Sequence, residues 1–453
     1  MLFSLTNPEV AIMMMGIFLF AVLLGFPIAF TLMAMGLGFG YYAYFDPTKM
    51  EHLFDNRIFQ LFVQNTYTVM DNNVLTAVPL FLFMGYLVER AGIVAKLFFA
   101  IRLASHKLPA SMAVAALITC ALFSTATGII GAVVTLMGLL AWPAMIKAGY
   151  DKKFASGIIC SGGCLGILIP PSIMLIVYSV IAQLSPLRLF AAAIFPGLML
   201  AGLYIAYAVF RAWLNPSIAP KPAAEEIPPP AVILKEVLVS FLPLFSLIIL
   251  VLGTILAGIA TPAEAAAVGA FGSLVLSYFY KTLKWKNFKE SVFLTAKTTA
   301  MIMWLFIGSW TFASVFSYLG GHEVFEHFFK SLNLQPWQFL VITQLIIFLL
   351  GWPLEWTEIL IIFVPIFLPL VEFFGVNPYF FAMLIALNLQ TSFLTPPMAM
   401  SAYYLKGVQS KNVELMQIFG GIMPFLGIVI LAMVLMYLFP GIALWLPETL
   451  FAN

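Results

Sequence analysis

Apolar segments long enough to cross a bilayer run along almost the whole chain. A transmembrane helix needs about 20 predominantly apolar residues. By this measure ten segments are predicted to span a membrane: 9–24, 27–45, 74–90, 154–182, 192–213, 236–258, 262–280, 291–319, 378–405 and 417–439. Only 9% of the residues are charged, against roughly 25% in soluble domains. We therefore predict an all-α polytopic membrane protein. Nucleic-acid binding is excluded, because the net charge is only +2 and no basic domain occurs.

Two further apolar regions, 110–146 and 337–374, are interrupted in the middle by small, polar and proline residues. The interruptions read Ser124-Thr125-Ala126-Thr127-Gly128 and Gly351-Trp352-Pro353-Leu354-Glu355. At mid-membrane depth such residues favour a turn that is packed against protein over a continuous helix. Both regions are therefore predicted to be re-entrant helical hairpins.

The chain contains an internal repeat on either side of a polar segment, 215–235. Residues 143–171 align without a gap with residues 369–397, at an offset of 226, and both stretches end in Pro-Pro. Each half then has five predicted spans and one hairpin, and an odd number of spans inverts the second half relative to the first. We predict a first inverted repeat over 1–214, a cytoplasmic linker over 215–235 and a second repeat over 236–453.

The distribution of positive charge predicts the orientation. If the N-terminus lies outside, the inner segments carry sixteen Lys and Arg residues and the outer segments carry four. Inner loops are enriched in these residues in membrane proteins. The first hairpin is therefore predicted to open to the cytoplasm and the second to the outside.

Two proline pairs, Pro170-Pro171 and Pro396-Pro397, lie inside predicted spans. Proline lacks an N–H group and clashes with the carbonyl four residues earlier, so each pair should break its helix and free two carbonyls. Carbonyl and hydroxyl oxygens are what a hard cation such as Na⁺ prefers. The predicted cation ligands lie at the breaks and hairpin tips: Ser124, Thr125, Thr127, Gly166, Ile167, Ser172, Gly351, Glu355, Thr391, Ser392, Phe393 and Thr395. A proline kink that only shapes packing is the alternative.

Other polar residues in the membrane are weighed against ordinary structural roles. Glu355, with Glu358 beside it, either binds a cation or extends to the outer surface. Helix N-termini at the hairpin tips suit an anionic substrate, and Asn388, Gln390 and Lys297 are further substrate candidates; Lys297 extending to the membrane surface is the alternative. No P-loop and no catalytic cluster occurs, which argues against an ATP-driven pump and an enzyme. We predict no metal other than Na⁺ and no organic cofactor.

Four stretches resemble the large membrane subunit of tripartite ATP-independent periplasmic (TRAP) transporters. They are PLFLFMGYLVERAGI (79–93), residues 149–198, ATPAEAAAVGA (260–270) and LNLQTSFLTPPMAMSAYYLKGV (387–408). The resemblance covers almost the whole chain. It implies a Na⁺-driven permease with the elevator-type fold of the ion-transporter superfamily, in a bacterial or archaeal inner membrane, with a periplasmic N-terminus. The substrate would be an organic acid, such as a C4-dicarboxylate or a 2-oxo acid.

The resemblance also implies partners and a motion. The partners are a small four-helix membrane subunit, a soluble periplasmic substrate-binding protein and membrane lipid. In the predicted elevator the hairpins and the broken spans 154–182 and 378–405 move together, with the amphipathic segments 93–107 and 321–333 as arms. Two departures from the family pattern are FSTATGIIG at the first tip and Glu355 where Asp is common. The alternatives are a self-sufficient Na⁺-coupled carboxylate transporter, a rocking motion about a fixed site, and a passive channel.

Overall fold

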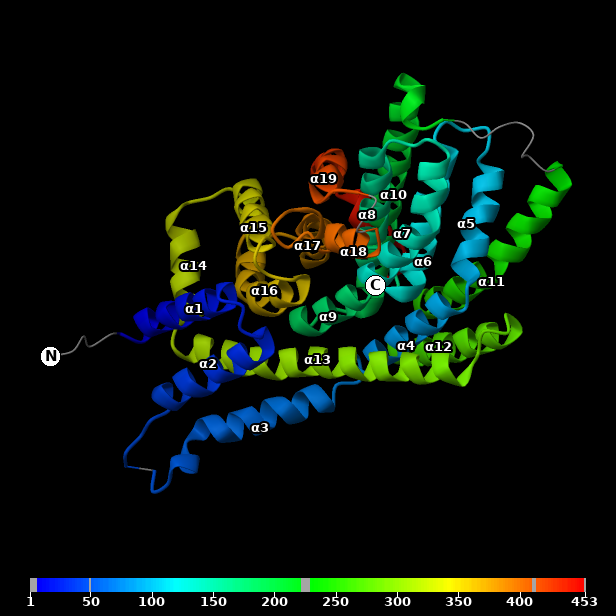
Figure 1. The fold of residues 1–453 in the computed structure, drawn as a ribbon. Coiled ribbons are helices and arrows are strands. Elements are labelled where there is room, and N and C mark those ends of the chain that lie inside the picture. The colour runs from blue at the N-terminus through cyan, green and yellow to red at the C-terminus, as the bar shows by residue number, and fades with distance from the viewer. Residues whose placement is uncertain (1–5, 49, 221–228, 410–412, 452–453) are drawn as a thin grey trace.

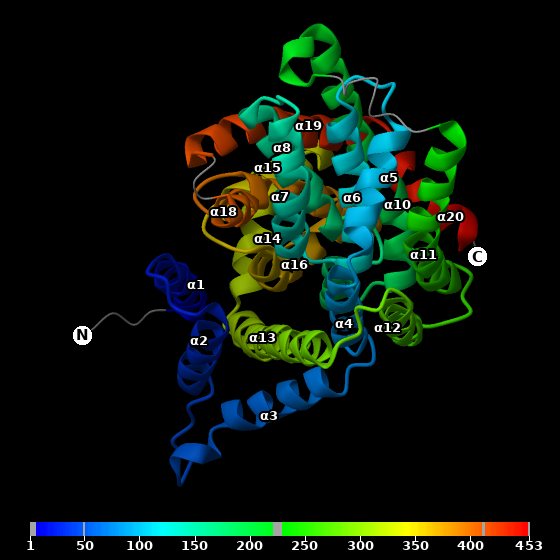
Figure 2. The ribbon, with the colours of Figure 1, turned by 45° about the vertical axis from the view of Figure 1, so that its right-hand side comes forward.

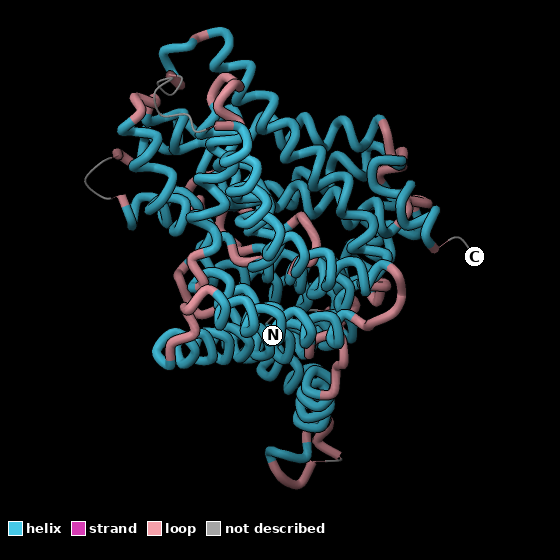
Figure 3. The backbone as a smooth tube through the Cα atoms, turned by 90° about the vertical axis from the view of Figure 1, so that its right-hand side faces the viewer, coloured by secondary structure: helices cyan, strands magenta, loops and turns pink. Residues whose placement is uncertain are grey.

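The computed structural model describes residues 6–48, 50–220, 229–409 and 413–451. Every regular element in these ranges is a helix, as the uniformly helical tube of Figure 3 shows. The predicted all-α class is therefore confirmed. Part of the predicted linker, residues 221–228, lies outside the described residues. Before it lies the short 3-10 helix η3 (Pro216–Ile218), and after it begins α11.

In the described part of the chain, seven helices are long and apolar enough to cross a membrane by themselves. They are α7 (Ile130–Lys147), α10 (Pro186–Leu214), α11 (Pro230–Leu256), α12 (Pro262–Phe279), α13 (Trp285–Tyr318), α16 (Trp356–Phe373) and α19 (Leu415–Leu438). An eighth is added if α4 (Ala77–Arg90) and α5 (Ile93–Ala104), which meet at 64°, count as one span. The chain is thus a multi-pass membrane protein, with fewer full-length spans among the described residues than the ten predicted.

The difference arises because hydropathy does not show where a helix ends. Helices α1 (Asn7–Leu23) and α2 (Ile28–Ala43) are apolar, but they are 17 and 16 residues long. Gly25 separates them with a φ of +85°, a conformation that glycine adopts without steric cost, and Pro27 follows it.

The two regions predicted as hairpins each consist of two helices that contact each other across a short turn. In the first, α6 (Ser111–Thr127) and α7 are joined by Gly128 and Ile129, and Gly128 has a φ of +62°. In the second, α15 (Pro336–Leu350) and α16 are joined by residues 351–355. The turns fall at the polar interruptions that the sequence contains.

The two proline pairs interrupt helices. Helix α8 (Lys152–Cys164) and the 3-10 turn η2 (Leu165–Ile167) end before Pro170, and α9 (Ile173–Ala182) begins after Pro171. In the second half α17 (Pro378–Leu394) ends before Pro396, and α18 (Met400–Val408) begins after Pro397. Because proline cannot donate a backbone hydrogen bond, helical hydrogen bonding stops at both places.

The 3-10 helix η1 (Leu53–Asp55) and three α-helices complete the fold of the described residues. Helix α14 (Gly321–Ser331) lies in the predicted amphipathic segment 321–333, whereas α3 (Arg57–Met70) and α20 (Gly441–Leu450) were not predicted. Helix α3 is too polar to be found as an apolar segment in the sequence, but its Ile58 is fully buried against Gly40 of α2. Helix α20 packs against α10.

The long helix α13 crosses one side of the molecule. Figures 1 and 2 show α2 and α3 beside one stretch of it, and α4 and α12 near the other. The hairpins and broken helices lie on the opposite side of α4 and α13 and pack on one another, for example α7 against α18 and α16 against α9. Helices α4 and α13 therefore lie between α2, α3 and α12 on one side and the hairpins and broken helices on the other.

The helix boundaries recur at a nearly constant offset between the two halves. Helices α7 and α16 are both 18 residues long and begin 226 residues apart. Helix α13 begins 228 residues after α3 begins and ends 228 residues after α4 ends. Gly92 and Gly320, with φ of +68° and +80°, follow at the same offset. The two halves differ in one respect: the stretch that forms the single helix α13 in the second half is divided into α3 and α4 in the first.

Candidate functional site

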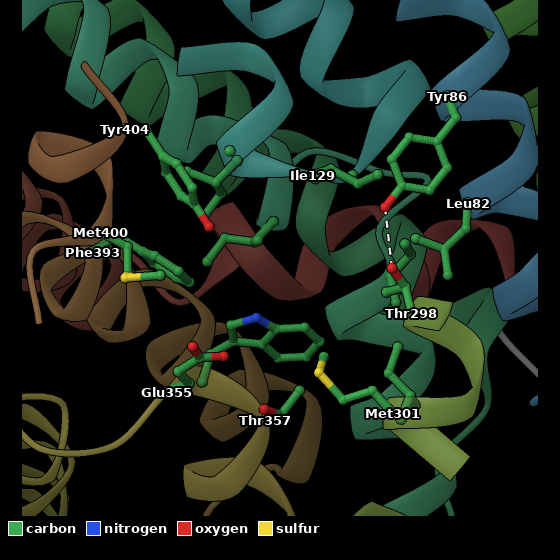
Figure 4. A pocket seen from close by; sticks show the side chains of 17 residues that line it. Leu82, Tyr86, Ile129, Thr298, Met301, Glu355, Thr357, Phe393, Met400 and Tyr404 are labelled. Carbon is green, nitrogen blue, oxygen red and sulfur yellow. Dashed lines mark hydrogen bonds between the residues drawn. The ribbon is translucent and has the colours of Figure 1, made fainter. Parts of the chain in front are cut away.

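A cavity of about 270 Å³ lies where the hairpin turns, the helix breaks and helices α4 and α13 meet (Figure 4). Its wall is largely apolar, with a few hydroxyls and one carboxylate. The lining residues are Leu82, Tyr86, Gly128, Ile129, Ile130, Gly131, Ile167, Ile173, Thr298, Met301, Ile302, Glu355, Trp356, Thr357, Phe393, Met400 and Tyr404. Both halves of the chain contribute to it.

Four helices begin at the wall of this cavity. The first residues of α7, α9, α16 and α18 are Ile130, Ile173, Trp356 and Met400, and all four line the cavity. The N–H groups of a first helical turn have no partner within the helix, and the N-terminus carries a partial positive charge. This arrangement attracts an anion without a basic side chain.

The first hairpin tip touches the first helix break at Ser124 and Gly166. A Cβ atom on Gly166 would lie 2.8 Å from Ser124 Cβ, so only glycine fits at this position. Ser124 is fully buried, and its hydroxyl has no hydrogen-bond partner. An unpartnered buried hydroxyl is costly unless a ligand satisfies it.

The second hairpin tip also touches the second helix break, but the glycine and the serine have exchanged places. Here the glycine, Gly351, is at the tip and the serine, Ser392, is at the break. A Cβ atom on Gly351 would overlap the Ser392 hydroxyl and lie 3.0 Å from Ser392 Cβ. Ser392 is 4% exposed, and its hydroxyl also lacks a partner. Each tip–break contact therefore holds one glycine and one buried serine with a free hydroxyl.

The other five predicted hydroxyl ligands donate to backbone carbonyls. Thr125, Thr127, Thr391 and Thr395 donate to carbonyls three or four residues earlier in their own helices. Ser172 Oγ donates to the carbonyl of Ile167 at 2.6 Å. These bonds distinguish Ser124 and Ser392 from the rest of the predicted set.

The carbonyls of Ile167 and Phe393 are equivalent in the two halves. Both residues line the cavity, and each carbonyl accepts a serine hydroxyl at 2.6 Å, from Ser172 and from Ser401 respectively. Ser401 was not predicted, because it is not at the repeat position of Ser172. A carbonyl oxygen has two lone pairs, so each retains capacity for a cation.

Two carboxyl groups lie at the N-terminus of α16. Glu355 is the N-cap residue and lines the cavity, and Glu358 in the first turn is 4% exposed. One Glu358 carboxyl oxygen has no hydrogen-bond partner. Neither residue forms an ion pair with another described residue. Glu355 is half-buried and faces the cavity.

The three further substrate candidates lie outside the cavity wall. Lys297 is exposed on α13, next to Thr298, which does line the cavity. Asn388 is buried and donates to the Gln344 carbonyl at 2.6 Å. Gln390 is fully buried, and its amide N and O atoms have no partner.

Tyr86 and Tyr404, which line the cavity, were not predicted from the sequence. The Tyr86 hydroxyl is 3.1 Å from the Thr298 hydroxyl, which connects α4 to α13. The ring of Tyr404 lies against Gly131, where an added Cβ would come within 2.9 Å of it. In Figure 4 the Tyr404 hydroxyl and the Glu355 carboxyl both point toward the centre of the cavity. Helical periodicity does not reveal such contacts between distant helices.

Fold and site together define a multi-pass helical membrane protein with a cavity between its two halves. Similar solved structures are the YdaH transporter of Alcanivorax borkumensis (TM-score 0.62, 15% identity, 92% of this chain and 98% of that one) and Neisseria gonorrhoeae MtrF (TM-score 0.55, 14% identity, 94% and 95%). At this level of identity the likeness concerns the fold alone.

The sequence matches the family of the DctM component of tripartite ATP-independent periplasmic transporters over residues 15–442, and the chain belongs to this family. It is 28% identical to the C4-dicarboxylate TRAP transporter large permease protein DctM of Pseudomonas aeruginosa, covering 85% of this chain and 88% of that protein. It is 30% identical to the sialic acid TRAP transporter large permease protein SiaM of Vibrio cholerae, covering 84% and 87%. The isethionate TRAP transporter permease protein DctMQ of Oleidesulfovibrio alaskensis is 28% identical, over 84% of this chain and 59% of that protein.

Proposed function

We propose that this chain is the large permease of a Na⁺-coupled TRAP transporter that imports an organic acid across a bacterial or archaeal inner membrane. Its partners in this proposal are a small four-helix membrane subunit and a soluble periplasmic binding protein. The names of the relatives support a carboxylate or sulfonate substrate.

The observation that carries the Na⁺ proposal is the reciprocal glycine–serine contact at both hairpin tips. Ser124 and Ser392 are buried and their hydroxyls are unpartnered, and the carbonyls of Ile167 and Phe393 belong to the same two breaks. Hydroxyl and carbonyl oxygens are the ligands of hard cations. These oxygen atoms therefore fit Na⁺ at each hairpin tip. At the second tip the carboxyl groups of Glu355 and Glu358 lie nearby.

The anionic substrate is assigned to the cavity between the two tips. The N-termini of four helices there provide unpaired N–H donors and partial positive charge. Bound Na⁺ at the tips would add positive charge beside the same cavity, so substrate and cation binding would favour each other.

Thermal unfolding of the full chain in lipid nanodiscs tests the cation site. A ligand that binds only the folded state raises the melting temperature. We expect stabilisation by NaCl but not by choline chloride at equal ionic strength. Ser124→Ala and Ser392→Ala should each weaken the Na⁺ response, whereas Ser314→Ala, on α13, should not, because the Ser314 hydroxyl already donates to the Trp310 carbonyl. Equal responses to the two salts would contradict the proposal.

The proposed architecture is a pair of inverted repeats over 1–214 and 236–453. The constant offsets between helix boundaries support it. The excess of Lys and Arg in one set of loops supports a periplasmic N-terminus.

The proposed motion is an elevator in which the two hairpins and the four helices of the broken spans move as one body. Their mutual packing supports it. Helices α4 and α13 lie between this body and α2, α3 and α12, whereas α5, α10 and α19 pack directly on it. The body contacts α13 at Ser309, whose hydroxyl donates to the Ile361 carbonyl at 3.2 Å.

Cysteine cross-links test the motion in a background without Cys120 and Cys164. A link between Ser309→Cys and Ile361→Cys joins the body to α13 and should stop transport. A link between Cys160 and Ser401→Cys lies within the body, where Cys160 Sγ is 3.6 Å from the Ser401 carbonyl, and should leave transport intact. The opposite pattern would favour a rocking motion.

The second candidate function is a self-sufficient Na⁺-coupled transporter. The YdaH transporter and MtrF have the same fold. Uptake by this chain in proteoliposomes, without any partner, would favour this candidate over the tripartite one.

A further inference from the structure

Few polar side chains of the cavity are available to a substrate. Five lining residues carry a polar side-chain group besides the indole of Trp356. The hydroxyls of Tyr86 and Thr298 are 3.1 Å apart and bind each other. The carboxyl group of Glu355 belongs to the cation in the proposed function. Thr357 and Tyr404 then remain, with one hydroxyl each, to hydrogen-bond the body of a substrate.

Apolar side chains form most of the remaining wall. They include Leu82 of α4, Ile167 and Ile173 on either side of the first proline pair, and Phe393 before the second, and all four are buried. A substrate hydroxyl placed against such a wall loses its hydrogen bonds to water without replacement, which weakens binding. An alkyl or aryl group placed there is removed from water, which strengthens binding.

Three large side chains can adapt this wall to an apolar group. Trp356 is the first residue of α16, directly after Glu355, and presents a broad apolar ring system. Met301 of α13 and Met400, the first residue of α18, also line the cavity, and Figure 4 shows them on different sides of it. Methionine is flexible and makes favourable contacts with rings. An apolar group between these side chains would be well packed.

The size of the cavity limits the help that water can give. Its volume of about 270 Å³ lies below the roughly 300–1,000 Å³ of typical small-molecule sites. A substrate with a single ring leaves little room for the water molecules that otherwise bridge hydroxyls to a protein. Substrate hydroxyls therefore depend on the few polar side chains of the wall.

Resting on the proposed function, we propose that the cavity takes organic acids with a compact apolar body, such as a six-membered ring or a branched alkyl group, and that Trp356 determines this specificity. The carboxylate binds at the N-termini of α7 and α9, and the body packs between Trp356, Met301 and Met400. Polyhydroxylated acids are the class that this cavity rejects.

Matched pairs of acids test this inference on the full chain in nanodiscs with saturating Na⁺. Cyclohexanecarboxylate is compared with quinate, and hexanoate with gluconate. The members of each pair share a carboxylate and a carbon skeleton and differ in their hydroxyl groups. Dissociation constants are measured by calorimetry, and titrations of empty nanodiscs are subtracted to remove partition into lipid.

The variants are Trp356→Ser, Met301→Thr and a matched control, Trp337→Ser. Trp337 lies in the first turn of α15, the other helix of the same hairpin, is 52% exposed and does not line the cavity. Met301 is 50% exposed, so Met301→Thr keeps the test informative if Trp356→Ser does not fold.

We expect the wild type to bind cyclohexanecarboxylate about 100-fold more tightly than quinate. Thr357 and Tyr404 can serve two of the four quinate hydroxyls, and each of the other two costs about a factor of ten. Trp356→Ser should reduce the ratio about tenfold and Met301→Thr about threefold, because each replaces apolar surface by a hydroxyl. Trp337→Ser should leave the ratio unchanged. The ratio is the readout because weaker Na⁺ binding would affect both acids of a pair alike.

Three results would contradict the account in distinguishable ways. Quinate and gluconate that bind the wild type as tightly as their apolar partners would overturn the proposed selectivity and leave a Na⁺-coupled carboxylate permease intact. A ratio unchanged in Trp356→Ser would overturn the role of Trp356. Failure of all four acids to bind at any Na⁺ concentration would count against the carboxylate cavity of the proposed function as well.

Discussion

The contact between Gly351 and Ser392 allows a quantitative test of the proposed cation site. Gly351 has φ −65° and ψ −9°, which alanine also adopts without strain. Gly351→Ala is therefore limited by space alone, because the new Cβ would overlap the Ser392 hydroxyl. Either the Ser392 hydroxyl must turn away or the tip must move from the break, and overpacking of this kind costs about 1–3 kcal/mol.

If that cost falls on the Na⁺-bound state, Na⁺ affinity should decrease about 5- to 150-fold, since 1.4 kcal/mol corresponds to a factor of ten. The assay is Na⁺ titration of the melting temperature in nanodiscs, at constant ionic strength. Gly202→Ala is the matched control, because a Cβ at this position in α10 meets nothing within 4 Å.

The reversed arrangement of the first half suggests a rescue. Gly351→Ser combined with Ser392→Gly places the serine at the tip and the glycine at the break, as Ser124 and Gly166 are placed. We expect this double variant to bind Na⁺ more tightly than Gly351→Ala. Wild-type affinity in Gly351→Ala, or a double variant no better than the single one, would refute the role of this contact.

Further expectations concern the first helix break, an ion pair and the partners. Pro170→Ala with Pro171→Ala restores two backbone N–H donors. We expect this double variant to lose the Na⁺ dependence of uptake while its melting temperature changes little; a normal Na⁺ dependence would contradict this. Arg90 pairs with Glu290 at 3.5 Å with side-chain exposures of 20% and 47%, so Arg90→Gln should change unfolding free energy by less than about 1 kcal/mol in a denaturant titration. Omission of the small subunit should abolish uptake that depends on the binding protein in proteoliposomes.

The sequence predicts the helical class and the principal interruptions because each has a local cause. Proline pairs stop hydrogen bonding wherever they occur, and Gly128 and Gly351 fall at the turns between hairpin helices. The lengths of the helices are predicted less well, because the end of a helix depends on single residues such as Gly25. Helix α3 is missed because its stability comes from packing, through Ile58 against Gly40, and not from its hydropathy.

The candidate site shows the same division between local and distant causes. Residue type identifies seven hydroxyl groups near the tips and breaks, but only the fold shows that five donate to carbonyls while those of Ser124 and Ser392 are free. The direction of a side chain is likewise set by the fold. Lys297 and Thr298 are neighbours, and only Thr298 faces the cavity.

The most direct test of the central claim is uptake of a labelled organic acid by proteoliposomes that contain this chain, its small subunit and its binding protein. An inward Na⁺ gradient is imposed without ATP, and the membrane voltage is clamped. The account predicts accumulation that requires the gradient and is lost when choline replaces Na⁺. Undiminished accumulation in the absence of Na⁺ would contradict it.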